Sequence, residues 1–217
     1  FRQSGCSSGR MKNIREALIE GTSLLKESVT TSGTPFLDAV ILLAFVLKIS
    51  KEKILASYPD PIIQSDLAAY KEILQKRIAN IPVSYLTGKK EFFGLNFYVD
   101  KNVLVPRPDS ETIVEAAIDI LNTFPKMKNI LDLCTGSGAL GIALKYTLPY
   151  LDVICSDLSC EALEICRKNS QSILGQELKV IQSNLFDKIE GSFDLIITNP
   201  PYLTEEETED MMGTGWK

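Results

Sequence analysis

From about residue 110 onward, short apolar runs alternate with longer stretches of helical spacing. The runs lie at 130–133, 153–155, 180–181 and 195–197, and a helix is expected over about 110–122. Strands that alternate with helices along a chain usually pair in parallel, because each crossover helix returns the chain to the end of the sheet where the previous strand began. The pattern therefore predicts an α/β domain with a doubly wound, Rossmann-like sheet and four parallel strands.

The region from Lys12 to Asn80 has a different character. Its apolar residues recur at helical spacing, as in Leu67, Tyr70 and Leu74. Thr34 before Pro35 suits a helix start, with the hydroxyl as cap and proline at the first position. The longest apolar run, from 39 to 47, is far shorter than the roughly 20 residues that span a membrane, so a buried core helix is expected. These signals predict a small bundle with helices near 12–28, 35–48, 51–57 and 65–80.

Between the two regions, aromatic and β-branched residues surround a glycine turn, first over 91–99 and then at 103–105. We interpret this segment as a β-hairpin linker. Four parts are predicted: a Ser/Gly-rich appendage over 1–10 ahead of Met11, a helical domain over 11–81, the linker over 82–109 and the α/β domain over 110–217.

The composition limits the ligands and reactions that are expected of this chain. The formal net charge of −5 and the sequence pI near 5.0 argue against tight, direct binding of nucleic acid. The chain has no histidine, which removes the commonest metal ligand and the commonest general base, so a metal-free reaction is expected. The five cysteines are odd in number and form no C-x-x-C pair, which favours a reducing, cytoplasmic setting.

A glycine-rich loop follows the first strand of the α/β domain. Gly136, Gly138 and Gly141 match the short G-x-G-x-x-G pattern, so a dinucleotide cofactor is one reading. Asp132 favours another, because its charge would repel a pyrophosphate but attract the ammonium and sulfonium groups of S-adenosylmethionine. The candidate cofactor residues in this segment are Asp132, Cys134, Thr135, Gly136, Ser137 and Gly138.

Two later strand ends add to the predicted cofactor site. Asp157 ends the second strand, where a carboxylate can accept hydrogen bonds from a ribose diol, and Ser159 suits the cap of the next helix. After the third strand, Leu185 or Phe186 is a candidate for packing against adenine, with a place in the core as the alternative.

The segment Asn199-Pro200-Pro201-Tyr202 follows the fourth strand, at the edge where open α/β sheets bind ligands. A planar NH2 group is a poor nucleophile because its lone pair is delocalised. The Asn199 side-chain oxygen and the Pro200 carbonyl can each accept a hydrogen bond from this NH2 group. Pro201 stiffens the loop, and Tyr202 can stack on the planar group. Asn199, Pro200 and Tyr202 are therefore the predicted catalytic residues, and together with Pro201 they form the predicted substrate pocket.

With these motifs, the chain resembles the HemK-like protein-glutamine N5-methyltransferases from Met11 to about Leu203. The segments 82–88, 91–94 and 106–111 look like that family's inter-domain hairpin and its exit. The resemblance implies a class I methyltransferase domain that uses S-adenosylmethionine and yields S-adenosylhomocysteine. It also implies a monomer whose helical domain docks class I peptide chain release factors and whose substrate is the glutamine of their Gly-Gly-Gln loop, a modification that modulates translation termination. The cofactor residues carried over are Cys134 to Gly138, Asp157, Leu185 and Asn199.

Two departures from the family pattern concern single residues, and a third concerns length. Cys134 stands where glycine is common, which matters little if its φ is negative, and Leu185 replaces a larger aromatic. The family's sheet normally has seven strands, so a chain with four is expected to be C-terminally incomplete. The strand over 193–198 would then lack a neighbour on one side, and part of the sheet would be uncovered.

Three alternatives stay open. Asn-Pro-Pro-Tyr also suits methylation of an adenine or cytosine amino group in nucleic acid. A ribosomal-protein glutamine would use the same pocket. A shortened sheet could instead leave a non-catalytic module that grips a release factor without cofactor.

Overall fold

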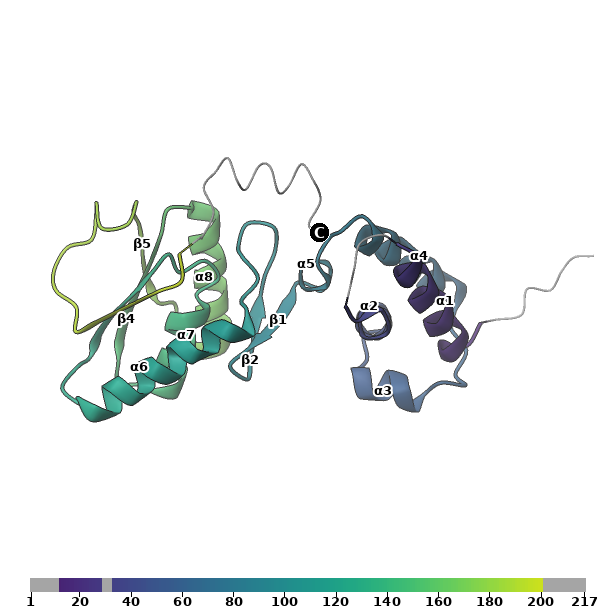
Figure 1. Cartoon of the computed structure of the whole chain (residues 1–217), viewed down its shortest axis with the longest axis horizontal. Coiled ribbons are helices and arrows are strands. Elements are labelled where there is room, and N and C mark those ends of the chain that lie inside the picture. Colours follow the sequence, from purple (N-terminus) through teal and green to yellow (C-terminus); the bar gives the residue numbers. More distant parts are fainter. Residues whose placement is uncertain (1–11, 29–32, 201–217) are drawn as a thin grey trace, which may run out of the picture. The chain divides into compact units, whose positions relative to one another are not determined.

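The computed structural model describes residues 12–28 and 33–200 (Figure 1). These residues form two compact units, one ending at Thr87 and one beginning at Gly88. The hairpin predicted as a linker over 82–109 thus lies mostly within the second unit. Across the described part of the chain, no helix combines the length and apolar character needed to cross a membrane.

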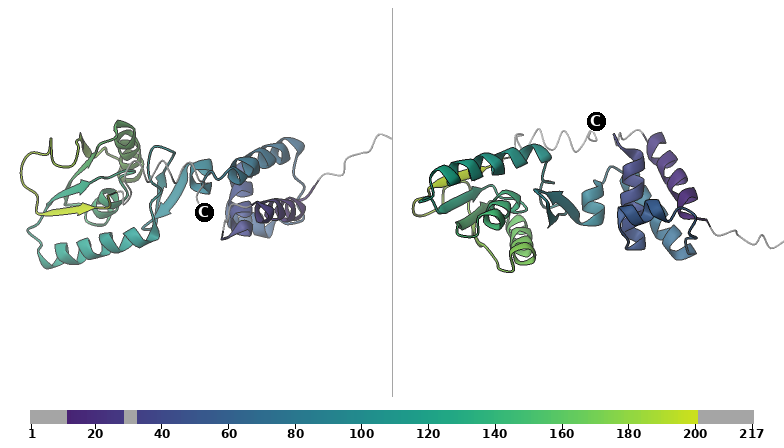
Figure 2. Two further views of the ribbon diagram at one scale, coloured as in Figure 1. Left: turned by 45° about the horizontal axis from the view of Figure 1, so that its top comes forward. Right: turned by 90° about the horizontal axis from the view of Figure 1, so that it is seen from below.

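The first unit is a helical bundle, as the spacing of its apolar residues predicts (Figure 2). Tyr70 is fully buried, and its hydroxyl donates a 3.2 Å hydrogen bond to the Ala39 carbonyl. A partly buried ion pair joins Arg77 Nε to Asp38 Oδ2 at 2.9 Å. The helices are α1 (Ile14–Glu27), α2 (Pro35–Leu47), α3 (Lys51–Ala56), α4 (Gln64–Ile78) and the short α5 (Val83–Thr87), which the sequence did not predict.

One predicted cap in this bundle is wrong. Thr34 is the N-cap residue of α2 and Pro35 occupies the first turn, but the Thr34 side chain makes no capping hydrogen bond. Its hydroxyl instead donates to Asp38 Oδ1 at 3.4 Å. The Thr34 backbone, with φ of −141° and ψ of +57°, lies outside the extended conformation that a capping residue usually adopts.

The second unit begins with a two-stranded hairpin, β1 (Lys89–Phe92) and β2 (Leu95–Tyr98). Phe93 and Gly94 form its turn with φ angles of +52° and +70°, as a tight primed turn requires. The run from 103 to 105, expected to take part in the hairpin, forms no strand. A 3₁₀ turn (Pro108–Ser110) then leads directly into α6 (Glu111–Thr123).

The predicted four-stranded parallel sheet is confirmed. Its strands are β3 (Asn129–Leu133), β4 (Asp152–Asp157), β5 (Lys179–Gln182) and β6 (Leu195–Thr198), in the order β5-β4-β3-β6. The crossover helices are α7 (Ala139–Thr147) and α8 (Cys160–Leu174). Within the described residues β6 pairs only with β3, as expected for an edge strand, and Ile196 on β6 is 44% exposed.

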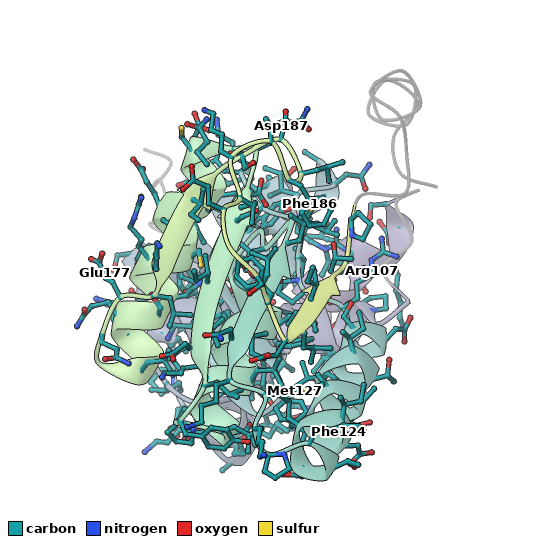
Figure 3. All side chains as sticks on the ribbon, turned by 90° about the vertical axis from the view of Figure 1, so that its left-hand side faces the viewer. Arg107, Phe124, Met127, Glu177, Phe186 and Asp187 are labelled. Atoms are coloured by element: carbon teal, nitrogen blue, oxygen red, sulfur yellow. The ribbon has the colours of Figure 1, made fainter. Side chains whose placement is uncertain are left out.

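Helices α6, α7 and α8 pack in a row against the sheet. Figure 3 looks onto the opposite face, where the segment between β5 and β6 crosses in front of the strands. Phe124 and Met127, which precede β3, lie at one end of the sheet, and Phe186 and Asp187, which follow β5, lie at the other. The segments that follow the strands thus gather at one edge, where the predicted site residues are found.

Candidate functional site

The loop between β3 and α7 is a tight turn that depends on two glycines. Gly136 and Gly138 have φ angles of +54° and +83°. A Cβ added at Gly136 would meet nothing within 4 Å, whereas one at Gly138 would overlap Ile142 and Cys166. Gly136 therefore faces open space at the loop apex, and Gly138 is required for the packing of the loop on α8.

Cys134 also adopts a left-handed conformation, with φ of +59°. A cysteine in place of glycine was expected to matter little only if its φ were negative. Since φ is positive, the side chain at this position is strained. The half-buried thiol contacts Thr198 at the end of β6, and burial raises its pKa. Cys134 thus connects the glycine loop to the strand that leads to Asn199.

Asp132 lies beneath this loop and is fully buried. Its Oδ2 accepts hydrogen bonds from the Thr135 hydroxyl at 2.6 Å and from the Gly141 N–H at 2.9 Å. Its Oδ1 has no hydrogen-bond partner among the described residues. Burial, opposed by these hydrogen bonds and reinforced by the negative charge of Asp157, raises the pKa of Asp132 to about 6.

Asp157, at the end of β4, braces the same loop. Its Oδ2 accepts the Gly136 N–H at 2.8 Å and its Oδ1 accepts the Ser159 N–H at 3.0 Å. Ser159 caps α8 by accepting the Ala162 N–H, which confirms its predicted role. The carboxylate that was predicted to bind a ribose is therefore held in place at the loop apex by two backbone groups.

The residues after β5 are not part of the core. Leu185 and Phe186 are 52% and 53% exposed, which excludes the core alternative for both. Leu185 has a φ of +48°, an uncommon conformation for a leucine. The Ser183 N–H donates to the Asp157 carbonyl at 3.0 Å, so this segment starts beside the end of β4.

Asn199 follows β6 directly and is half-buried, whereas Pro200 is exposed. The Asn199 Nδ2 donates a 3.1 Å hydrogen bond to the Ser110 hydroxyl. Pro201 and Tyr202 lie outside the described residues.

A pocket in the second unit unites several of the predicted site residues. Its lining comprises Phe92, Leu104, Pro106, Ser110, Cys134, Thr135, Gly136, Ser137, Ala139, Leu140 and Asn199. Four predicted cofactor residues from the glycine loop therefore share one pocket with the predicted catalytic asparagine. Four others, Asp132, Gly138, Asp157 and Leu185, are not in its lining.

Asn169 is buried on α8 and was not among the predicted site residues. Its Oδ1 accepts the Tyr98 N–H at 2.8 Å, and its Nδ2 donates to the carbonyls of Tyr98 at 3.0 Å and Ser137 at 2.8 Å. One side chain thus joins the hairpin to the glycine loop. The sequence signal for this role was a polar residue at helical spacing from the apolar Leu163 and Cys166.

The electrostatics of the site suit a cationic ligand. The charge of Asp157 raises the pKa of Asp132, so the two carboxylates lie close enough to interact. A positive group in the open space at Gly136 would be attracted by both, without direct contact with the fully buried Asp132. The residues present therefore fit the ammonium and sulfonium groups of S-adenosylmethionine. Within the described ranges, no three His, Cys, Asp or Glu side chains cluster as metal ligands would.

Two family models match this chain. The PrmC N-terminal domain matches residues 16–88, and the methyltransferase small domain matches residues 111–215. The first match covers the helical bundle, and the second covers the sheet, the glycine loop and Asn199.

Curated relatives are similar along most of the chain. A release factor glutamine methyltransferase of Leptospira interrogans is 39% identical over 180 residues, covering 81% of this chain and 63% of that protein. One of Clostridium acetobutylicum is 36% identical over 203 residues, covering 92% of this chain and 70% of that protein. This chain thus spans 63% and 70% of the lengths of these two relatives.

Among solved structures, a T. thermophilus 16S rRNA N2 G1207 methyltransferase in complex with AdoMet and guanosine is 21% identical, with a TM-score of 0.46. That alignment covers 54% of this chain and 33% of the other.

Proposed function

Because this chain belongs to the release factor glutamine methyltransferase family, we propose that it methylates glutamine with S-adenosylmethionine as donor. The proposed acceptor is the side-chain N5 of the glutamine in the Gly-Gly-Gln motif of class I peptide chain release factors. Methylation there would modulate translation termination.

The observation that carries this proposal is the shared pocket of the glycine loop and Asn199. A donor held at the loop and an acceptor held at Asn199 would meet at one pocket, so binding itself would bring the reacting groups together. Proximity and orientation of this kind supply much of the rate in reactions that need no covalent intermediate.

Asn199 and Pro200 would act on the acceptor. The nitrogen of a glutamine amide is weakly nucleophilic because its lone pair is shared with the carbonyl. Hydrogen bonds from its two N–H groups to Asn199 Oδ1 and the Pro200 carbonyl would fix its plane and favour the attacking geometry. Pro201 is proposed to stiffen this segment, and Tyr202 to stack on the amide plane.

The glycine loop and its neighbours would hold the donor. We assign this role to Asp132, Cys134 to Gly138, Asp157 and Leu185, with Asn199 at the boundary of the donor and acceptor sites. S-adenosylmethionine, when bound, supplies a methyl group on a positively charged sulfur, and the transfer itself needs no metal. The buried Asp132 and the braced Asp157 would stabilise the positive charge before transfer.

The helical unit is proposed to dock the release factor, and a cytoplasmic monomer without direct nucleic-acid contacts is proposed for the chain. The formal net charge of −5 supports the last point, because binding to phosphate backbones normally requires clustered positive charge.

Calorimetric titration of S-adenosylhomocysteine into the chain and into Asp157→Ala tests the donor site. Asp194→Ala is the matched control, because Asp194 also accepts two backbone N–H groups, from Lys128 and Asn129, but precedes β6 instead of following a strand. Binding that is lost with Asp157→Ala and kept with Asp194→Ala is expected. Equal binding by all three proteins would refute the assignment of Asp157.

Incubation with S-adenosylmethionine and candidate acceptors tests the substrate. A class I release factor should gain one methyl group on its Gly-Gly-Gln glutamine, located by fragmentation mass spectrometry. Its Gln→Asn variant, a ribosomal protein and single-stranded DNA serve as comparisons. Methylation of either of the last two in preference to the release factor would favour the corresponding alternative, and binding without any transfer would favour a non-catalytic module.

A further inference from the structure

We propose that Ser110 is a positioning residue for Asn199. Its hydroxyl receives the Nδ2–H group of the Asn199 amide and so sets the direction in which that amide presents its oxygen. This inference rests on the proposed function of Asn199 and adds to it the residue that holds the amide in its working orientation.

The contact joins residues that are distant in sequence. Asn199 Nδ2 lies 3.1 Å from Ser110 Oγ, although 89 positions separate the two residues. Both side chains are half-buried, and both line the pocket that also contains the glycine loop. The hydrogen bond therefore forms at the wall of the proposed active site.

The Ser110 hydroxyl is not engaged in capping α6. Ser110 is the last residue of the 3₁₀ turn and has helical dihedrals (φ −75°, ψ −11°), whereas a capping serine is usually extended, and its side chain makes no capping bond. Ser50 and Ser159, at the starts of α3 and α8, do make that bond. At α6 the hydroxyl contacts Asn199 instead, which separates Ser110 from the serines that only stabilise a helix.

The backbone around Ser110 is firmly held. Two prolines at 106 and 108 restrict the approach, and the Ser110 N–H donates to the Arg107 carbonyl at 3.0 Å. The next residue, Glu111, accepts the Phe93 N–H of the hairpin turn at 2.8 Å. The hydroxyl is thus presented from a rigid corner between hairpin and helix.

A fixed partner for Nδ2 has a direct effect on the rest of the Asn199 side chain. The carboxamide is planar, so holding its nitrogen on one side determines the side on which its oxygen lies. The backbone of Asn199 is itself restricted because Pro200 follows it. With both constraints, the acceptor oxygen needs little reorganisation when a glutamine amide enters.

A measurement on the side chain itself tests the contact without any substrate. The 15N carboxamide signal of Asn199, assigned by its loss in Asn199→Asp, is compared in the parent chain, Ser110→Ala, Ser110→Thr and the capping control Ser50→Ala. Faster hydrogen exchange and a shifted signal are expected only in Ser110→Ala, with Ser110→Thr restoring the parent behaviour. An unchanged Asn199 signal in Ser110→Ala would overturn the proposal.

Kinetics then decide whether the contact matters for transfer. In Ser110→Ala, kcat should fall about 10- to 100-fold, the cost of a displaced reacting group. Ser110→Thr should recover most of the rate. Full activity in Ser110→Ala would refute the positioning role. If the parent binds S-adenosylhomocysteine but methylates no glutamine, the proposed function fails, and the carboxamide signal still decides whether Ser110 holds Asn199.

Discussion

At the scale of single residues, Asp132 connects stability to the proposed cofactor site. A carboxylate that is fully buried, with one oxygen unpartnered among the described residues, is unfavourable when charged. Its pKa is raised from 3.8 to about 6, so the folded protein holds this proton more tightly than the unfolded chain does. The stabilisation from the bound proton is complete below pH 3.8 and is lost as the pH rises through about 6.

Replacing Asp132 by Asn should remove this pH dependence. Between about pH 4 and pH 7, the free energy of unfolding of Asp132→Asn should rise relative to the parent by roughly 2 to 3 kcal/mol. Chemical denaturation at several pH values measures the difference. Asp194→Asn, an exposed carboxylate whose pKa is lowered by two backbone hydrogen bonds, is the control and should not show that rise. If the free energy of unfolding changed with pH in the same way for Asp132→Asn and the parent, the raised pKa of Asp132 would be contradicted.

Cys134 gives a second prediction at this scale, because its φ of +59° suits glycine better than any branched side chain. Cys134→Gly should be at least as stable as the parent, since relief of backbone strain offsets the lost thiol contact. Cys134→Val should be less stable by about 1 to 3 kcal/mol. Thermal unfolding compares the two with Cys160→Val, an exposed cysteine on α8. Equal losses in Cys134→Val and Cys160→Val would argue against strain at Cys134.

At the scale of elements, the turn from β3 into α7 depends on close packing as well as on backbone conformation. Gly138 and Gly175 both have positive φ, but only Gly138 has atoms where a Cβ would lie, namely Ile142 and Cys166. Gly175→Ala should therefore cost only the conformational strain, about 1 kcal/mol, and Gly138→Ala roughly 3 kcal/mol or more. Equal changes in unfolding temperature for the two variants would show that packing at Gly138 is loose.

Most elements could be predicted because their signals are local. Apolar runs and helical spacing identified every strand of the sheet and the longer helices. The cap at Thr34 was mispredicted because its backbone, with ψ of +57°, is not in the extended conformation usual for a capping residue. The sign of φ at Cys134 and the links made by Ser110 and Asn169 depend on residues far away in the sequence, which local patterns do not contain. The candidate site was thus predictable as a set of strand ends, but not as a network.

At the scale of the whole molecule, residues 12–28 and 33–200 contain two hydrophobic cores without shared residues. One is built from the helices of the first unit and includes Leu42, and the other lies between the sheet and its helices and includes Leu144. Both leucines are fully buried, so they form a matched pair for asking whether each core supports its own unit.

Leu42→Ala and Leu144→Ala should each destabilise one unit, by about 2 to 5 kcal/mol. Hydrogen exchange followed by mass spectrometry should show faster exchange in peptides before residue 88 for Leu42→Ala and after it for Leu144→Ala. S-adenosylhomocysteine should slow exchange in the second unit of Leu42→Ala as much as in the parent, because the proposed donor site is built from that unit alone. Loss of this protection in Leu42→Ala would instead mean that the donor site depends on the helical core, and that the two units function as one.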